Sequence, residues 1–142
     1  LTDTKVIALD LAEDKRSRAL ALGADEAIGP DEDIAPCDLI IDFIGSDATL
    51  ATAAGAVARK GMVIVVGLGG GQTNFGLGKV SPEARFMTSF WGTRGQMDEL
   101  LDLARREPSV MPSVQTLPLT DAQQAHDRLR EGQVAGRIVL IP

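Results

Sequence analysis

The stretch Val6-Ile7-Ala8-Leu9-Asp10 decides the fold class of this chain of 142 residues. Four consecutive apolar residues closed by a carboxylate are typical of a buried parallel strand that ends in a polar group. The residues that follow, 12–22, have helical apolar spacing, with acidic side chains first and basic ones after, as the helix dipole favours. Gly23 then predicts a left-handed helix end. A strand followed directly by an amphipathic helix is the repeating unit of an α/β fold.

The same alternation continues along the rest of the chain. Apolar runs predict strands at 26–28, 38–44, 62–66, 86–90, 114–117 and 137–141, and helical spacing predicts helices at 46–58, 97–104 and 120–132. Ser46 is expected to cap the first of these helices, and the sequence Thr120-Asp121-Ala122-Gln123 to form a capping box at the last. The pattern predicts an α/β protein with a Rossmann-type, doubly wound parallel sheet, covered by helices on both faces.

Composition and charge exclude several classes of protein. The formal net charge of −6 offers no bulk attraction to nucleic acid or to an anionic membrane, and no apolar run approaches the ~20 residues of a membrane-spanning helix. The single cysteine, Cys37, cannot form an internal disulfide, and with the single histidine, His126, it cannot build a structural zinc site. We therefore expect a cytoplasmic protein without nucleic-acid or membrane partners, in which Cys37 lies at a strand entrance and His126 is structural.

Asp10 is the first candidate for a binding residue. Ligands of parallel α/β sheets bind at the carboxyl ends of the strands, where a carboxylate can accept hydrogen bonds from both hydroxyls of an adenosine ribose. Its charge repels a 2′-phosphate, which favours NAD over NADP. Lys15, near the start of the following helix, could reach the same ribose or could be a solvated surface lysine. The alternative role for Asp10 is a helix N-cap, and both roles can hold together.

The glycine-rich phosphate loop of a Rossmann fold is expected about 20 residues before Asp10, but only nine residues precede it. The sheet is therefore predicted to be incomplete, lacking its first βα unit. The loop from Gly67 to Gly78 is no substitute, because Gln72 occupies the third glycine position of the fingerprint and no helix is predicted after it. We expect these glycines to let the backbone approach a ligand closely or cross the sheet edge.

Two further residues at strand ends are open to two interpretations each. Trp91, the only tryptophan, could form a wall beside a planar ring or pack in the core or at the sheet edge. Arg137 could pair with a pyrophosphate or be an ordinary exposed arginine. No nucleophile motif, carboxylate pair or metal constellation is present in the sequence. We predict no catalytic residue, so that hydride chemistry would be supplied by a cofactor.

The order of these elements resembles the C-terminal part of the medium-chain, zinc-dependent alcohol dehydrogenases. The resemblance runs through nearly the whole chain and rests on the order and spacing of VIALDLAEDK, ALGADEAI, DLIIDFIGS, GMVIVVG, SFWGTRGQMDELLDLAR and LTDAQQAHDRLREGQVAGRIVLIP. It implies the NAD-binding portion of an oxidoreductase that transfers hydride between an alcohol and NAD. A secondary alcohol or ketone is the expected substrate.

The resemblance also implies a set of residues that contact the ligands. On the adenosine side of NAD these are Asp10, Leu11 and Lys15. Phe43 and Ile44 are implied along the path of the adenine and the nicotinamide ribose. On the nicotinamide side they are Val66, Gly67, Leu68, Ser89 and Trp91. Arg137 is implied at the pyrophosphate between the two halves, and Phe90 and Trp91 are implied at the border of the substrate pocket.

The resemblance further implies how the chain is divided. Residues 1–113 would form a truncated dinucleotide-binding domain, and residues 114–142 a segment that returns to the catalytic domain. The region 73–77 would help to pair subunits in a homo-oligomer, a dimer or a tetramer. In the family's strand order the absent first strand lies between the strands at 6–9 and 38–44, so its loss would leave unpaired backbone groups there.

The departures from the family limit what this chain is expected to do. The catalytic domain, with its zinc ligands and proton relay, is absent, so zinc belongs to the intact family enzyme and the 142-residue chain alone is expected to be inactive. A non-catalytic or degenerate module that holds NAD weakly is the first alternative. The second is a methyltransferase that uses S-adenosylmethionine, which also places an acid after its second strand, although FWG (90–92) and GRIVLIP (136–142) argue against it.

Overall fold

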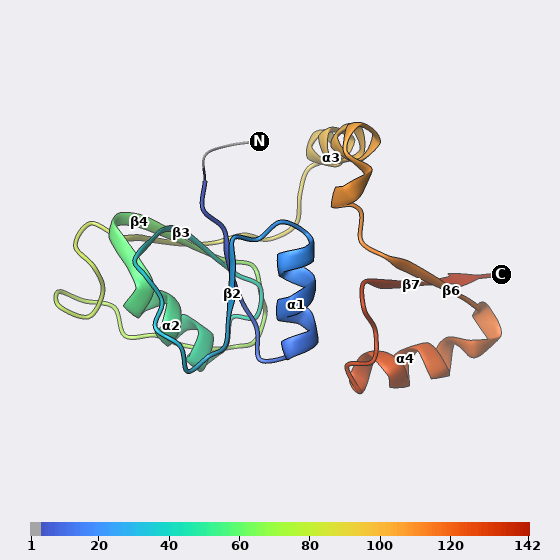
Figure 1. The fold of residues 1–142 in the computed structure, drawn as a ribbon, viewed down its shortest axis with the longest axis horizontal. Helices are drawn as coiled ribbons and strands as arrows, with labels where there is room; N and C mark the ends of the chain where they lie inside the picture. Colours follow the sequence, from blue (N-terminus) through green and yellow to red (C-terminus); the bar gives the residue numbers. More distant parts are fainter. Residues whose placement is uncertain (1–3) are drawn as a thin grey trace. The chain divides into compact units, whose positions relative to one another are not determined.

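The structure is a computed structural model that describes residues 4–142 (Figure 1). The chain divides into two compact units, the first ending at Trp91 and the second beginning at Gly92. The first unit contains β1 (Ile7–Leu9), α1 (Glu13–Ala21), β2 (Glu26–Ile28), β3 (Cys37–Asp42), α2 (Asp47–Ala56), β4 (Val57–Val65) and β5 (Arg85–Thr88). The second contains α3 (Arg94–Arg106), β6 (Val114–Pro118), α4 (Ala122–Arg130) and β7 (Arg137–Ile141), with short 3₁₀ helices at Pro108–Val110 and Leu119–Asp121.

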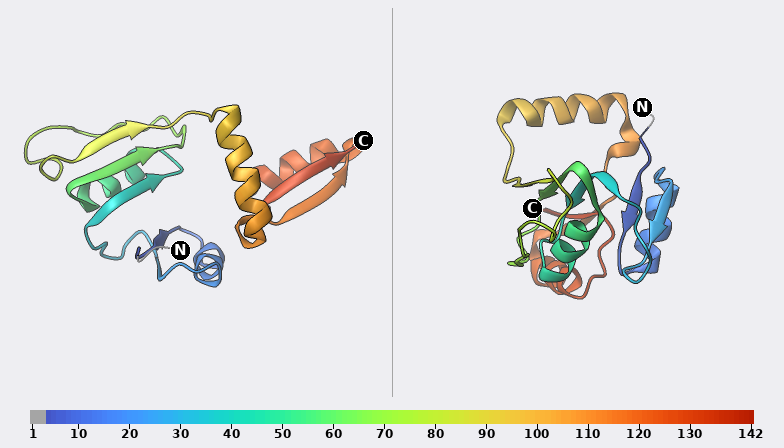
Figure 2. Two further views of the ribbon diagram at one scale, coloured as in Figure 1. Left: turned by 90° about the horizontal axis from the view of Figure 1, so that it is seen from above. Right: turned by 90° about the vertical axis from the view of Figure 1, so that its left-hand side faces the viewer.

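The strands pair in parallel throughout, as the alternating sequence pattern predicts. They form a two-stranded sheet β1-β2, a three-stranded sheet β3-β4-β5 and a two-stranded sheet β6-β7. Figure 2, left, shows β3, β4 and β5 side by side with α2 on one face. The α/β class with parallel sheets is therefore confirmed, although the strands do not form one continuous sheet.

The strands of the first unit form two separate sheets, and the family's strand order predicts a gap between β1 and β3. Among the described residues, β1 pairs only with β2, and β3 pairs only with β4 on one of its edges. Each of these two strands thus has an edge without a strand partner. Backbone donors and acceptors on such an edge are left to solvent or to another chain segment.

The core of the first unit lies between α2 and β4. Ala53, Val57 and Val63 are almost completely buried, and partly buried side chains of β3, β4 and β5 pack around them. Val57 was expected on a helix at 46–58, but α2 ends at Ala56 and Val57 begins β4, with its backbone extended and paired with Cys37. A β-branched residue that follows a helix favours the extended backbone, and this tertiary pairing overrides the helical spacing.

The helices cover less of the sheets than predicted. In the first unit α1 packs against β1 and β2, and α2 packs against β3 and β4. In the second unit α3 buries none of its residues, and its apolar side chains Met97, Leu100 and Leu101 are exposed. On α4 only Ala125 is buried. Within each unit, coverage of both sheet faces is therefore not observed.

The predicted helix ends are partly confirmed. The Ser46 hydroxyl accepts a hydrogen bond from the Thr49 amide (3.2 Å), and the Thr49 hydroxyl accepts one from the Ser46 amide (3.0 Å), so the N-cap prediction holds. Gly23 has the expected left-handed conformation, with φ of 103°. The capping box at Thr120 is wrong, because Thr120 lies within the 3₁₀ helix Leu119–Asp121 and the N-cap of α4 is Asp121, whose side chain makes no capping bond.

The remaining structural expectations concern single residues. Cys37 begins β3 and is half-buried, as predicted for a small residue at a strand entrance. His126 is exposed on α4. No helix within residues 4–142 is both long and apolar enough to cross a membrane.

Candidate functional site

The strand register brings the predicted nicotinamide-side residues to one edge of the three-stranded sheet. Asp42 is paired with Val65, and Val65 with Thr88, at the carboxyl ends of β3, β4 and β5. The residues that come next, Phe43, Val66 and Ser89, therefore leave the sheet at the same edge. This is the edge at which parallel α/β sheets bind their ligands.

Apolar side chains at this edge are exposed. They include Phe43, Ile44, Val66, Leu68, Phe90 and Trp91, and Leu11 is exposed in the same way after β1. Trp91 is 86% exposed. The alternative that it packs in the core of the first unit is therefore wrong. A group of exposed apolar residues at strand ends is the kind of surface that contacts a ligand or another protein.

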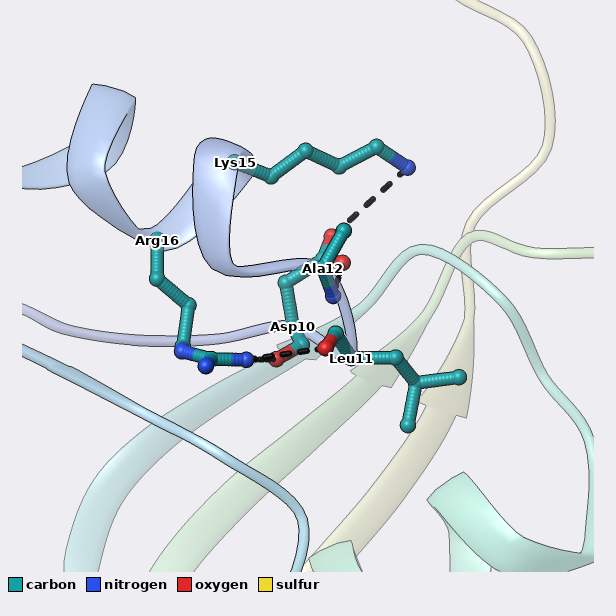
Figure 3. Close-up of polar contacts among 5 residues, drawn as sticks. All are labelled: Asp10, Leu11, Ala12, Lys15 and Arg16. Carbon is teal, nitrogen blue, oxygen red and sulfur yellow. Dashed lines mark hydrogen bonds and ion pairs between the residues drawn. The ribbon is translucent and has the colours of Figure 1, made fainter.

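Asp10 lies directly after β1 and keeps one carboxylate oxygen largely free (Figure 3). Its Oδ1 accepts a hydrogen bond from the Ala12 amide (2.9 Å), whereas Oδ2 lies 4.0 Å from the Lys15 ammonium. The N-cap of α1 is Ala12, so the alternative role of Asp10 as the N-cap is wrong. Instead Asp10 bonds the amide two residues on, which is an Asx turn. This turn directs Oδ2 toward the side occupied by Lys15.

Arg16 is a residue of this site that the sequence analysis missed. Its Nη1 donates hydrogen bonds to the carbonyl oxygens of Asp10 (2.8 Å) and Leu11 (2.9 Å), as Figure 3 shows. The guanidinium therefore ties the first turn of α1 to the turn that carries Asp10. The available signal was a second cation beside Lys15 near the helix start, a position that the helix dipole does not favour.

The glycine-rich loop after β4 packs directly on the backbone that follows β3. The Gly69 amide donates to the Ile44 carbonyl (2.8 Å), and the Gly71 amide donates to the Gly45 carbonyl (2.8 Å). A Cβ on Gly67 would lie 2.1 Å from the carbonyl carbon of Ile44. The glycines thus allow a close backbone approach to the turn after β3, whereas their predicted approach to a ligand stays a prediction. No helix follows the loop, which also agrees with the prediction.

Asp42 is the second residue that the sequence analysis missed, and it lies beneath these two loops. It is only 7% exposed, and its Oδ1 accepts hydrogen bonds from the amides of Ile44 and Gly45, both at 2.9 Å. Its backbone carbonyl accepts from the amides of Val66 (2.8 Å) and Gly67 (3.1 Å). Its Oδ2 is buried and has no hydrogen-bond partner among the described residues. The available signal was an acid inside an otherwise apolar strand.

Asp42 is ionised at neutral pH. Burial by itself raises the pKa of its carboxyl. The hydrogen bonds from the Gly45 and Ile44 amides lower the pKa, and the nearby Thr49 hydroxyl lowers it further. Together these effects outweigh burial, so the pKa lies below its ordinary value. A buried carboxylate costs free energy unless its oxygens are hydrogen-bonded. Oδ1 meets this requirement within the chain, whereas Oδ2 keeps an acceptor position that is still open.

The backbone after β5 is also constrained. The Ser89 amide donates to the Val65 carbonyl (2.8 Å), so its carbonyl oxygen is the backbone group that could face a ligand. Trp91 has a left-handed backbone, with φ of 60°, which is uncommon for a bulky residue and concentrates at functional sites. The rings of Phe90 and Trp91 meet edge to face, with centroids 5.3 Å apart. Phe90 therefore supports the exposed indole.

The other predicted site residues belong to other elements of the chain. Arg137 belongs to the second unit, where it begins β7, is exposed, and donates its amide to the Ser113 carbonyl (2.9 Å). In the region 73–77, Phe75 meets Phe86 edge to face with centroids 5.7 Å apart, while Leu77 is fully exposed. Within residues 4–142 no group of three or more His, Cys, Asp or Glu side chains could hold a metal ion.

Comparison with known proteins defines the class of this chain. A family model described as zinc-binding dehydrogenase matches residues 2–106. Because this match covers well over half of the chain, the chain belongs to the zinc-binding dehydrogenase family. The resemblance to medium-chain, zinc-dependent alcohol dehydrogenases is thereby confirmed.

Individual relatives are alcohol dehydrogenases and related enzymes. An alcohol dehydrogenase of Geobacillus stearothermophilus is 34% identical over an alignment of 147 positions, which covers 95% of this chain and 42% of the relative. The structure of the alcohol dehydrogenase of Aeropyrum pernix matches with a TM-score of 0.84 and 33% identity, over 99% of this chain and 44% of that one. Acetophenone reductase of Geotrichum candidum, in complex with NAD, matches with a TM-score of 0.83 and 30% identity, over 96% and 41%. The chain thus spans about two fifths of these relatives.

Proposed function

We propose that this chain is the NAD-binding portion of an alcohol dehydrogenase that transfers hydride between a secondary alcohol, or the corresponding ketone, and NAD. The observation that carries the proposal is the Asp10 carboxylate at the carboxyl end of β1, whose Oδ2 lies 4.0 Å from the Lys15 ammonium. A carboxylate in this position can accept hydrogen bonds from both ribose hydroxyls. Its negative charge disfavours the 2′-phosphate of NADP.

The residues at the strand ends fit the two ends of the cofactor. Asp10 and Lys15 would hold the adenosine ribose, with Leu11 exposed beside the adenine. On the nicotinamide side the exposed side chains and backbone groups are those of Phe43, Ile44, Val66, Gly67, Leu68, Ser89 and Trp91. NAD supplies the hydride chemistry when bound, and these groups bind and orient it.

The remaining regions would have the roles of the matching positions in the family. Arg137 would pair with the pyrophosphate, and Phe90 with Trp91 would border the substrate pocket. Residues 1–113 would belong to the dinucleotide-binding domain and 114–142 to a segment that returns to the catalytic domain, whereas the structure divides the chain into compact units between Trp91 and Gly92. Subunit pairing through the region 73–77 and a cytoplasmic location belong to the same proposal.

Zinc has no place among the described residues of this chain, since they contain no suitable cluster of ligands. No catalytic step is therefore assigned to zinc here. The proposal places the metal and the proton relay in a catalytic domain, and the chain alone is expected to show no alcohol-dependent reduction of NAD. Measurable turnover by the purified 142-residue chain would contradict this part of the proposal.

Titration with NADH tests the cofactor assignment. We expect addition of NADH to the ¹⁵N-labelled chain to shift the amide signals of Ala12 and of residues 66–68, and NADPH to shift them less at equal concentration. Asp10→Ala should weaken NADH binding by about tenfold or more, because it removes hydrogen bonds to a charged group. Asp14→Ala is the matched control, since Asp14 is exposed in the first turn of the same helix.

Three results would count against the cofactor proposal. Equal weakening by Asp10→Ala and Asp14→Ala would mean that Asp10 contributes only charge. Shifts confined to regions away from Ala12 and residues 66–68 would place NADH elsewhere. Stronger binding of S-adenosylmethionine than of NADH would favour the methyltransferase alternative.

A further inference from the structure

The Asp42 carboxylate is the one buried acidic group among the described residues, and it lies where three loops leave the sheet. Its Oδ1 holds two consecutive amides, those of Ile44 and Gly45, at 2.9 Å each. Two amide donors on one carboxylate oxygen fix the direction of the chain after β3, because both N–H bonds must point at the same atom.

The fixed turn in turn holds the glycine-rich loop. The peptide between Ile44 and Gly45 is planar and trans, so the Gly45 amide that points at Asp42 turns the Ile44 carbonyl away from it, where this carbonyl accepts the Gly69 amide (2.8 Å). The next carbonyl, that of Gly45, accepts the Gly71 amide (2.8 Å). The Asp42 carbonyl holds the other end of the same loop through the amides of Val66 and Gly67. The backbone hydrogen bonds from residues 66–71 to the segment after β3 are therefore accepted either by Asp42 itself or by a residue whose amide Asp42 binds.

We propose that Asp42 is a positioning residue for the nicotinamide side of the cofactor site, which holds the main chain at Val66 to Leu68 in the conformation that receives the ligand. This inference rests on the proposed function for the identity of the ligand. The fixed conformation itself is a property of the chain. Asp42 acts through Ile44 and Gly45, and its own carboxylate is buried away from the edge where the ligand would lie.

A purely structural role for Asp42 makes a different prediction. Loss of a core group would loosen the whole first unit, including the amide of Val63 in the core and the turn at Asp10 and Ala12. A positioning role confines the effect to the amides of Gly69 and Gly71 and to the cofactor response of residues 66–68. The two roles are distinguished by which amides change their exchange rate or their response to the cofactor when Asp42 is substituted.

Two substitutions of Asp42 and one control make the test specific. Asp42→Ala removes the acceptor of the two amides. Asp42→Asn keeps an acceptor oxygen at the Oδ1 position and places its NH₂ where Oδ2 has no partner among the described residues. Asp38→Asn makes the same change of charge on the same strand, at an exposed residue. Amide hydrogen exchange and NADH titration are measured on the ¹⁵N-labelled 142-residue chain and its variants.

We expect Asp42→Ala to speed exchange of the Gly69 and Gly71 amides by on the order of tenfold relative to Val63, since each depends on a hydrogen bond whose acceptor is no longer held. NADH should still shift Ala12 in this variant, while its effect on residues 66–68 is lost. Asp42→Asn should retain most of the protection and the shifts, and Asp38→Asn should match the unmodified chain.

The proposal is overturned if Asp42→Ala leaves Gly69 and Gly71 as protected as before, if it speeds exchange of Val63 equally, or if Asp42→Asn behaves like Asp42→Ala. Should Asp42→Ala fail to fold, Asp42→Asn still decides the matter, because retained protection at Gly69 and Gly71 supports the proposal and lost protection overturns it. If NADH shifts no signal in the unmodified chain, the proposed cofactor is wrong, whereas the exchange data still decide whether Asp42 holds the loop.

Discussion

Substitution of Gly67 by alanine tests whether the loops at the strand ends are locked by backbone contact. A Cβ at this position would lie 2.1 Å from the carbonyl carbon of Ile44 and 2.3 Å from its oxygen. Non-bonded carbon atoms prefer separations of about 3.5–4.0 Å. Because the obstructing atoms belong to the backbone, a change of rotamer cannot relieve the clash, and one of the two loops must move.

The expected cost follows from the contacts that would be lost. Displacing the loop stretches the hydrogen bonds from the Gly67 amide to the Asp42 carbonyl (3.1 Å) and from the Gly69 amide to the Ile44 carbonyl (2.8 Å). An overpacking cost of about 1–3 kcal/mol and about 1 kcal/mol for each of the two weakened hydrogen bonds combine to a destabilisation of about 3–5 kcal/mol. This is a large share of the stability of a domain of this size.

Gly55→Ala is the matched control with the opposite expected sign. Gly55 lies in α2, and a Cβ there would meet nothing within 4 Å. Alanine in a helix is favoured over glycine, so this variant should be more stable by about 0.5–1 kcal/mol. Urea denaturation followed by far-ultraviolet circular dichroism measures both variants. If Gly67→Ala were as stable as the unmodified chain while Gly55→Ala behaved as expected, the two loops would not be locked as described.

Two further predictions concern Asp42 and the second unit. The folded-state pKa of Asp42 is lowered, because its hydrogen bonds outweigh the opposing effect of burial. Its carboxylate therefore stabilises the fold at pH values above the ordinary pKa of 3.8. This contribution to stability disappears as the pH falls through the folded-state pKa. The difference in unfolding free energy between the unmodified chain and Asp42→Asn should therefore be constant above about pH 5 and shrink as the pH falls below 3.8; a difference that did not shrink there would contradict the lowered pKa. Gly136→Ala should loosen the β6-β7 pair, because Gly136 has φ of 93° and its Cβ would lie 2.2 Å from the Ser113 carbonyl oxygen. Hydrogen exchange of the Arg137 amide measures this effect, and Gly132→Ala, which has positive φ but no neighbour within 4 Å, should cost only the backbone strain of about 1–2 kcal/mol.

Short-range sequence patterns were sufficient for most elements of the fold. The strands Glu26–Ile28 and Arg137–Ile141 have the predicted bounds, and Ser46 caps α2 as predicted. These features depend on neighbouring residues, such as an apolar run or a hydroxyl before a helix. Val57 and Thr120 were assigned wrongly because their conformations depend on a strand partner in one case and on a 3₁₀ turn in the other.

The candidate site was only partly predictable. Asp10 is recognisable because a carboxylate directly after a buried strand has a known use in such sheets. Asp42 and Arg16 were missed because what they hold is backbone: Asp42 binds the amides of Ile44 and Gly45, and Arg16 the carbonyls of Asp10 and Leu11. Backbone groups are the same in every residue, so a side chain that binds them needs no particular residue type nearby, and the sequence does not indicate which segment it binds.

The sequence by itself determined the α/β class, the parallel strands and the candidate ribose carboxylate, because each depends on residue type and spacing along the chain. Only the tertiary structure decided that the glycine-rich loop packs on the turn after β3, that a buried aspartate holds both, and that β1 and β3 each have an edge without a strand partner among the described residues. The physical reason is that hydrogen bonds between distant backbone segments and the burial of a charge depend on which segments meet in space.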